Sequence, residues 1–133
     1  MARILIADDS RFMRSAVREA MELMGHEVAE AADGDAALAL YRSSPADVVI
    51  TDMFMPGKDG VEVIQILRQD NPDVKVIAIT GGNVVQNAMV SQHVIAEVAL
   101  NAAKAIGAER VFTKPFELKE VIKAVEELLA GSK

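Results

Sequence analysis

Five short runs of residues rich in Val and Ile recur along the chain, separated by longer stretches with a helical pattern. The runs lie at 3–7, 27–31, 47–51, 74–80 and 110–113. They are largely apolar rather than alternating, which is typical of parallel strands that helices cover on both faces. Because strands that alternate with helices form right-handed parallel crossovers, the pattern predicts an α/β fold. We expect a doubly wound sheet of five strands with five helices.

The stretches between the runs carry the signals of helices. An apolar stripe that ends at Gly25, a natural C-terminal cap, predicts a helix over about 10–24. Two further helices are predicted over 34–43 and 60–70, each of which stops shortly before a proline. The last apolar stripe, over 118–129, predicts the C-terminal helix.

Composition limits the classes of protein that fit. A chain of 133 residues with 51% hydrophobic side chains can build one core, so we expect a single domain over 1–133. The net charge of −6 argues against nucleic-acid binding. The sequence has no long apolar run and no signal-peptide layout, so we expect a cytoplasmic protein that does not contact a membrane. The lack of cysteine excludes disulfides and Cys-ligated metals.

Polar residues stand where four of the predicted strands end. They are Asp8 and Asp9 after the first strand, Asp52 after the third, Thr80 at the end of the fourth and Lys114 after the fifth. The carboxyl ends of the strands in an open parallel sheet share one edge, and ligands bind there. We therefore expect these five side chains to form one site.

The chemistry of this set favours a metal and a phosphoryl group. Three neighbouring carboxylates repel one another unless a cation lies among them. Hard oxygen ligands suit Mg²⁺ better than zinc or copper. Lys114 and Thr80 add a positive charge and a hydroxyl donor, which a phosphoryl group beside a metal requires. The residues predict a Mg²⁺ site for phosphoryl transfer to or from an oxygen.

Four segments carry a resemblance to a known family. They are IADDSRFMR (6–14), VVITDMFMPGKDG (48–60), AIT (78–80) and FTKPF (112–116). Together they resemble the receiver domain of bacterial two-component response regulators, most closely the single-domain, chemotaxis-type regulators. The resemblance runs from Arg3 to about Leu129 and implies the flavodoxin-like receiver fold with strand order 2-1-3-4-5.

The resemblance also implies a role for each site residue. Asp52 would be the phosphoacceptor, a carboxylate nucleophile that takes a phosphoryl group from a histidine kinase or a phosphotransfer protein. The protein would then signal to a downstream protein, whose identity the sequence does not give, through the face of the fourth helix, fifth strand and fifth helix. It would not be an enzyme, since its chemistry is confined to its own aspartate. The Mg²⁺ ligands would be Asp9, Asp52 and the backbone carbonyl of Phe54, with Asp8 acting through water, and Thr80 and Lys114 would bind the phosphoryl oxygens.

Three features depart from the family's pattern. Val111 occupies the place of the Tyr or Phe that usually partners Thr80, and Phe112 beside it should face the other side of the strand. The connection between the fourth and fifth strands is longer than usual, with its surplus around 81–93. Because that surplus is apolar and uncharged, we expect this extended region either to lengthen the fourth helix toward its N-terminus or to form an apolar lip over the site, and to contact a partner. Phe54 should place an aromatic ring beside the acyl phosphate.

Two other functions compete with a phosphorylation switch. The chain could be a phosphorylation-independent interaction module with the receiver fold, which Val111 and the long connection favour but the complete set of site residues opposes. It could also be an aspartate-nucleophile phosphatase of the haloacid dehalogenase kind. That class requires a second acid two residues after the nucleophile, and Phe54 occupies the place.

Overall fold

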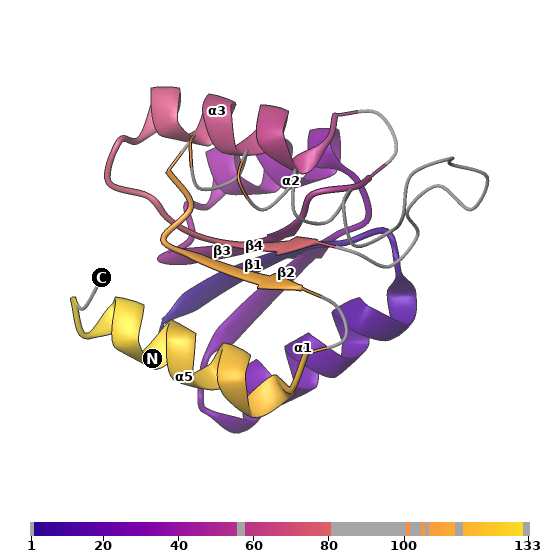
Figure 1. Ribbon diagram of the computed structural model, residues 1–133, viewed down its shortest axis with the longest axis vertical. Helices are drawn as coiled ribbons and strands as arrows, with labels where there is room; N and C mark the ends of the chain where they lie inside the picture. Colours follow the sequence, from indigo (N-terminus) through magenta and orange to yellow (C-terminus); the bar gives the residue numbers. More distant parts are fainter. Residues whose placement is uncertain are drawn as a thin grey trace.

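A parallel sheet of five strands lies between two layers of helices (Figure 1). The computed structural model describes residues 2–55, 58–80, 101, 105, 107–113 and 116–131. The strands are β1 (Arg3–Ala7), β2 (Glu27–Ala31), β3 (Val48–Asp52), β4 (Lys75–Thr80) and β5 (Arg110–Thr113). The helices with described bounds are α1 (Arg11–Leu23), α2 (Gly34–Ser43), α3 (Gly60–Asp70) and α5 (Leu118–Leu129).

The strand order is β2-β1-β3-β4-β5, and every neighbouring pair is parallel. This confirms the predicted α/β class and the strand order that the resemblance implied. The fourth predicted helix and the extended 81–93 region lie outside the described residues. The third strand begins and ends one residue later than predicted, and Asp52 still pairs with Ile79 of β4.

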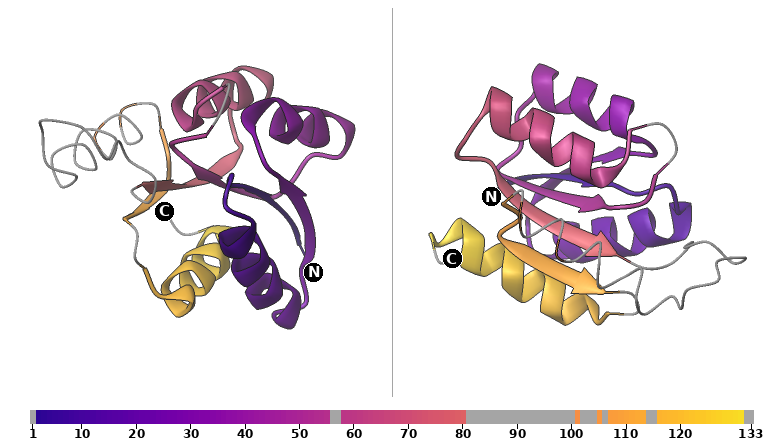
Figure 2. Two further views of the ribbon diagram at one scale, coloured as in Figure 1. Left: turned by 90° about the vertical axis from the view of Figure 1, so that its right-hand side faces the viewer. Right: turned by 45° about the horizontal axis from the view of Figure 1, so that its top comes forward.

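Each face of the sheet carries its own core. Side chains such as Ile6, Ile50 and Ile79 pack with α1 and α5, whereas Leu5 and Val49 pack with α2 and α3. Figure 2 shows the two helical layers from two further directions. All five residues of β3 are buried, as expected for a strand that is covered on both faces. The sheet therefore forms a rigid support for the residues at its edges.

Short polar side chains begin the helices next to the sheet edge. The side chain of Ser10 accepts a hydrogen bond from the Met13 N–H (3.2 Å), and Asp59 accepts one from the Glu62 N–H (2.9 Å). Gly25, at a φ of 88°, follows the end of α1 as predicted. Because Ser10 is the cap of α1, neither Asp8 nor Asp9 is needed for that purpose.

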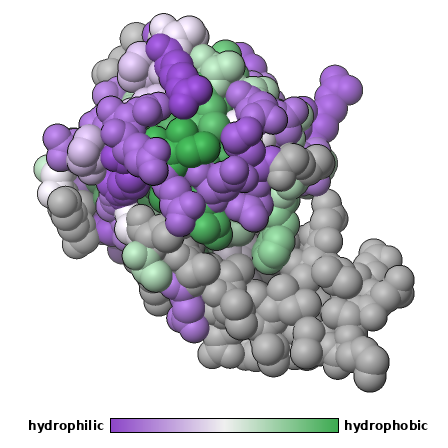
Figure 3. All heavy atoms as spheres, turned by 90° about the horizontal axis from the view of Figure 1, so that it is seen from above, coloured by the Kyte–Doolittle hydropathy of each residue, from purple (hydrophilic) through white to green (hydrophobic). Residues whose placement is uncertain are grey.

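The outer surface of the α2–α3 layer is mostly polar. Figure 3, which views the molecule from this side, shows hydrophilic residues over most of the coloured surface with apolar residues between them. Throughout the described part of the chain, no helix has the length and apolar character that a membrane span requires.

Candidate functional site

Three carboxylates meet where β1 and β3 end. Ala7 pairs with Thr51, so the next residues along these two strands, Asp8 and Asp52, lie side by side. Asp8, Asp9 and Asp52 each offer an oxygen, and these oxygens lie within 4.8 Å of one another. Asp8 and Asp52 are only 2% and 3% exposed. The structure thus brings together the three predicted acids in a largely buried cluster.

Backbone N–H groups orient two of these carboxylates. The Ser10 N–H donates to Oδ1 of Asp8 (2.8 Å), and the Phe54 N–H donates to Oδ1 of Asp52 (3.0 Å). A hydrogen bond from a fixed backbone donor stabilises an ionised carboxylate and restricts its rotation. Ser10 was not among the predicted site residues, although serine is a common cap at the start of a helix and this preference could have indicated it.

Two buried oxygens at this edge have no hydrogen-bond partner among the described residues. They are Oδ1 of Asp9 and Oγ1 of Thr80. An unsatisfied buried polar atom costs about 1–3 kcal/mol, so native proteins keep few of them. Both atoms lie at the edge where a cation and an anionic group are predicted to bind. The acidic cluster with its unpartnered oxygen fits a hard divalent cation such as Mg²⁺.

The connection from β3 to α3 folds back tightly against the end of β3. The Met53 N–H donates to the Ile79 carbonyl (2.8 Å), and the Gly60 N–H donates to the Met53 carbonyl (3.1 Å). A Cβ atom on Gly60 would lie 2.4 Å from the Asp52 carbonyl oxygen. Asp59, the residue before Gly60, caps α3. The close approach of Gly60 to Asp52 was missed, although a glycine inside a helix start often indicates such a contact.

Thr80 and the last residue of β5 lie at the carboxyl edge of the sheet. Thr80 is fully buried and pairs with Thr113, the last residue of β5. At the other end of β5, the Glu109 N–H donates to the Val76 carbonyl (2.9 Å), and Arg68 of α3 donates to the Glu109 carboxylate (2.7 Å). These contacts fix the register of β5 against β4. Lys114, the fifth predicted site residue, lies outside the described residues.

Val111 and Phe112 face opposite sides of the sheet, as predicted. Val111 packs against the core beside α2 and α3, whereas Phe112 packs against the core beside α1 and α5. The ring of Phe112 lies 6.1 Å from that of Phe116. Phe54 is partly buried and packs against the same core as Val111. Phe112 therefore does not replace an aromatic residue on the face that Val111 occupies.

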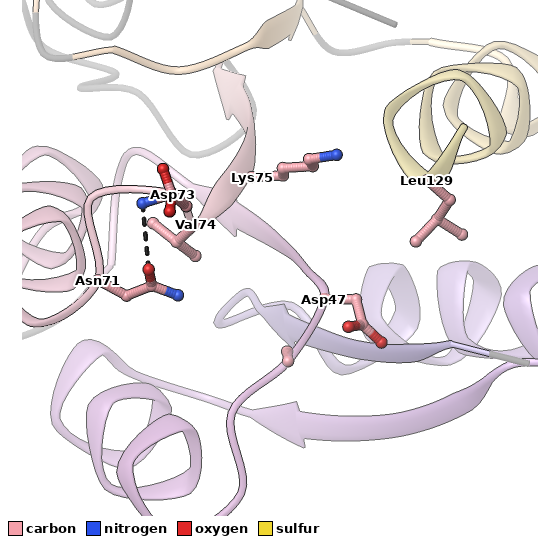
Figure 4. A pocket seen from close by; sticks show the side chains of 7 residues that line it. Asp47, Asn71, Asp73, Val74, Lys75 and Leu129 are labelled. Atoms are coloured by element: carbon pink, nitrogen blue, oxygen red, sulfur yellow. Dashed lines mark hydrogen bonds between the residues drawn. The ribbon is translucent and has the colours of Figure 1, made fainter. Parts of the chain in front are cut away.

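A second hollow, of about 280 Å³, lies at the opposite edge of the sheet (Figure 4). Three of its four polar side chains are engaged within the protein. Lys75 donates to the Leu128 carbonyl (2.6 Å), and Asp47 accepts from the Arg3 N–H (2.8 Å). Asn71 accepts from the Asp73 N–H (3.1 Å). The hollow therefore lacks a convergent set of groups like the one at the carboxyl edge.

The fold and this edge together define a doubly wound α/β protein with a buried acidic site at the carboxyl ends of its strands. The family model described as the response regulator receiver domain matches residues 4–126. The chain therefore belongs to the response regulator receiver domain family. Members of this family are phosphoacceptor signalling modules of two-component systems rather than enzymes, and they typically bind Mg²⁺ at an acidic pocket.

Two bacterial relatives and one bacterial solved structure match this chain over nearly their whole length. The chain is 35% identical to Protein CcdB from Bacillus subtilis, over 97% of this chain and 98% of the relative. It is 32% identical to the response regulator receiver protein CpdR from Brucella abortus, over 99% and 100% of the two chains. The solved structure of the chemotaxis response regulator CheY4 of Vibrio cholerae has a TM-score of 0.79 at 28% identity, over 96% of this chain and 98% of that one.

Proposed function

We propose that this chain is a response regulator that accepts a phosphoryl group on Asp52 and signals through a phosphorylation-dependent protein contact. The observation that carries the proposal is the placement of Asp52 at the end of a fully buried strand, with an oxygen within 4.8 Å of those of Asp8 and Asp9. A carboxylate nucleophile needs positioning and charge compensation more than covalent help from the protein. The edge provides both.

The proposed donor is a phosphohistidine of a histidine kinase or a phosphotransfer protein. One carboxylate oxygen of Asp52 forms a bond to phosphorus as the phosphorus–nitrogen bond of the phosphohistidine breaks. The bonding electrons stay on the imidazole nitrogen that leaves, and the other ring nitrogen of the phosphohistidine carries a proton, so the products are an acyl phosphate and a neutral histidine. The hydrogen bond from the Phe54 N–H (3.0 Å) holds the carboxylate while one of its oxygens reacts.

Asp8, Asp9, Asp52 and the backbone carbonyl of Phe54 are the groups proposed to hold Mg²⁺. The fit rests on the three clustered carboxylates and on the buried Oδ1 of Asp9, which lacks a partner among the described residues. When bound, Mg²⁺ would supply positive charge that offsets the charge of the carboxylates and of the phosphoryl oxygens. The Ser10 N–H keeps the Asp8 carboxylate oriented toward the cluster.

Thr80 and Lys114 are proposed to bind the oxygens of the transferred group. The Thr80 hydroxyl is buried and has no partner among the described residues, so it is available to donate. Lys114 is the residue after Thr113, which pairs with Thr80, and this place in the sequence supports its assignment to the same site. A lysine and a hydroxyl would recognise the group by charge and by hydrogen bonding.

The proposed output is contact with a downstream protein rather than a reaction on a separate substrate. We place the contact on the face that the family resemblance implies, which comprises β5, α5 and the segment that precedes β5. A phosphoryl group adds negative charge that biases a two-state element, which is how phosphorylation switches generally act. We further propose that the chain works as one receiver domain in the cytoplasm, where its kinase would act.

Intact mass spectrometry tests this function. The protein is incubated with Mg²⁺ and either acetyl phosphate or phosphoramidate, and Asp52→Asn is treated in parallel. We expect the wild-type mass to increase by one phosphoryl group and the variant mass to stay unchanged. A wild-type protein that gains no phosphoryl group would contradict the proposal and favour a phosphorylation-independent interaction module.

A further inference from the structure

Arg14 of α1 reaches back to the acidic cluster, although it does not follow a strand. Its Nη1 donates to the backbone carbonyl oxygen of Asp8 (2.8 Å), and its Nε donates to Oε1 of Glu30 (3.3 Å). The Arg14 side chain is only 16% exposed. A guanidinium with two fixed partners in a partly buried position has little rotational freedom.

Glu30 of β2 holds Arg14 in this orientation. Its second carboxylate oxygen accepts a hydrogen bond from Arg18, which lies one turn further along α1. The hydrogen bond from Arg18 is the main cause that lowers the pKa of Glu30 from its usual value, so Glu30 is ionised at neutral pH. Both of its oxygens are therefore engaged with α1.

These contacts hold the backbone of Asp8 from two sides. The Asp8 N–H donates to the carbonyl of Ala31 (3.1 Å), the residue after Glu30 in β2. The Asp8 carbonyl accepts from Arg14, which Glu30 orients. The same carbonyl belongs to the peptide bond that leads into Asp9. The position of that peptide plane decides where the Asp9 carboxylate points.

We propose that Arg14, oriented by Glu30, is a positioning residue that fixes the Asp8–Asp9 peptide so that both carboxylates are held ready for a divalent cation. The inference rests on the proposed function, because the cation is the one assigned to that site. It adds a residue from the helix to a site otherwise built from strand ends and the loops that follow them.

The direction in which the loss of Arg14 changes Mg²⁺ affinity distinguishes a positioning role from simple electrostatics. By Coulomb's law alone, removing a positive charge near an acidic cluster strengthens the binding of Mg²⁺. If Arg14 positions the ligands, its removal weakens binding instead. Arg18 provides a matched control, because it is an arginine of the same helix and shares Glu30 but has no described hydrogen bond to Asp8.

Titration calorimetry with Mg²⁺ on the full chain tests the proposal with Arg14→Gln and Arg18→Gln. We expect Arg14→Gln to raise the Mg²⁺ dissociation constant about tenfold, as the loss of a group that orients metal ligands does. Arg18→Gln should leave it within about twofold, since exposed charge pairs contribute little. A second readout needs no metal: hydrogen exchange at the Ser10 N–H, which donates to Asp8, should be faster in Arg14→Gln than in Arg18→Gln.

The outcomes are distinguishable. A dissociation constant that is unchanged or lower in Arg14→Gln would overturn the positioning role, and so would equal weakening in both variants. A merely stabilising role would lower the melting temperature of both variants without a difference in Mg²⁺ affinity between them. A wild-type protein that binds no Mg²⁺ would contradict the proposed function itself. In that case exchange at the Ser10 N–H alone decides whether Arg14 holds the Asp8 backbone.

Discussion

The acidic residues of the site lie close to one another and are largely shielded from solvent. Asp52 and Asp8 have almost no contact with solvent, and each receives a hydrogen bond from a backbone N–H. Oδ1 of Asp9 has no such donor among the described residues. Negative charges this close to one another repel in the absence of a cation. The acidic cluster without a bound cation is therefore expected to reduce the stability of the fold.

Asp9→Asn tests directly whether the metal-free acidic cluster reduces the stability of the fold. Replacing the carboxylate with an amide relieves the repulsion and should stabilise the metal-free protein by about 1 kcal/mol, the Coulomb energy of two unit charges about 4 Å apart in water. The same variant should lose most of its Mg²⁺ binding. Thermal unfolding in a chelator and in Mg²⁺ measures both effects, with Asp73→Asn, an exposed acid at the opposite edge, as a control of equal charge change. A metal-free melting temperature below that of the wild type would contradict the account.

Among the elements, the start of α3 is held unusually close to the end of β3. Gly60 has no room for a side chain, because a Cβ atom would lie 2.4 Å from the Asp52 carbonyl oxygen and 2.6 Å from Cα of Met53. Both neighbours are backbone atoms, which cannot move without shifting β3. The helix therefore constrains the position of Asp52, the proposed phosphoacceptor, as well as covering the core.

Gly60→Ala should impair the reaction beyond its effect on stability. The added methyl group overpacks the contact and should cost about 1–3 kcal/mol. Gly25→Ala is a matched control: Gly25 has a φ of 88° and no atom within 4 Å of its would-be Cβ, so the substitution costs about 1–2 kcal/mol of backbone strain away from the site. We expect slower phosphorylation by phosphoramidate only in Gly60→Ala. Equal rates in the two variants would show that the close contact does not position Asp52.

Over the whole molecule, the sequence predicted the architecture because the signals were local. Apolar runs, caps and prolines placed the strands and the described helices within one or two residues. The rule that ligands bind at the carboxyl edge of a parallel sheet then brought Asp8, Asp9 and Asp52 together without structural information. The structure confirms that these three acids are neighbours.

The contacts that position the site were not predictable in the same way. Arg14 lies within a segment that matched the family, yet its contact with the Asp8 carbonyl depends on how α1 packs against β2. The approach of Gly60 to Asp52 likewise depends on the path of the β3–α3 connection. Both are long-range or backbone contacts, which periodicity and residue type do not encode. The sequence thus predicted which groups would react, whereas the structure shows contacts that hold these groups in place.

The central claim, that Asp52 accepts the phosphoryl group, is tested most directly by locating the modified residue. After phosphorylation in Mg²⁺, the acyl phosphate is reduced with borohydride, which converts the modified aspartate to homoserine, and the digested peptides are sequenced by mass spectrometry. The account predicts homoserine at position 52 and at no other aspartate. Homoserine at Asp8, Asp9 or Asp59, or at no position in a protein that has gained a phosphoryl group, would contradict it.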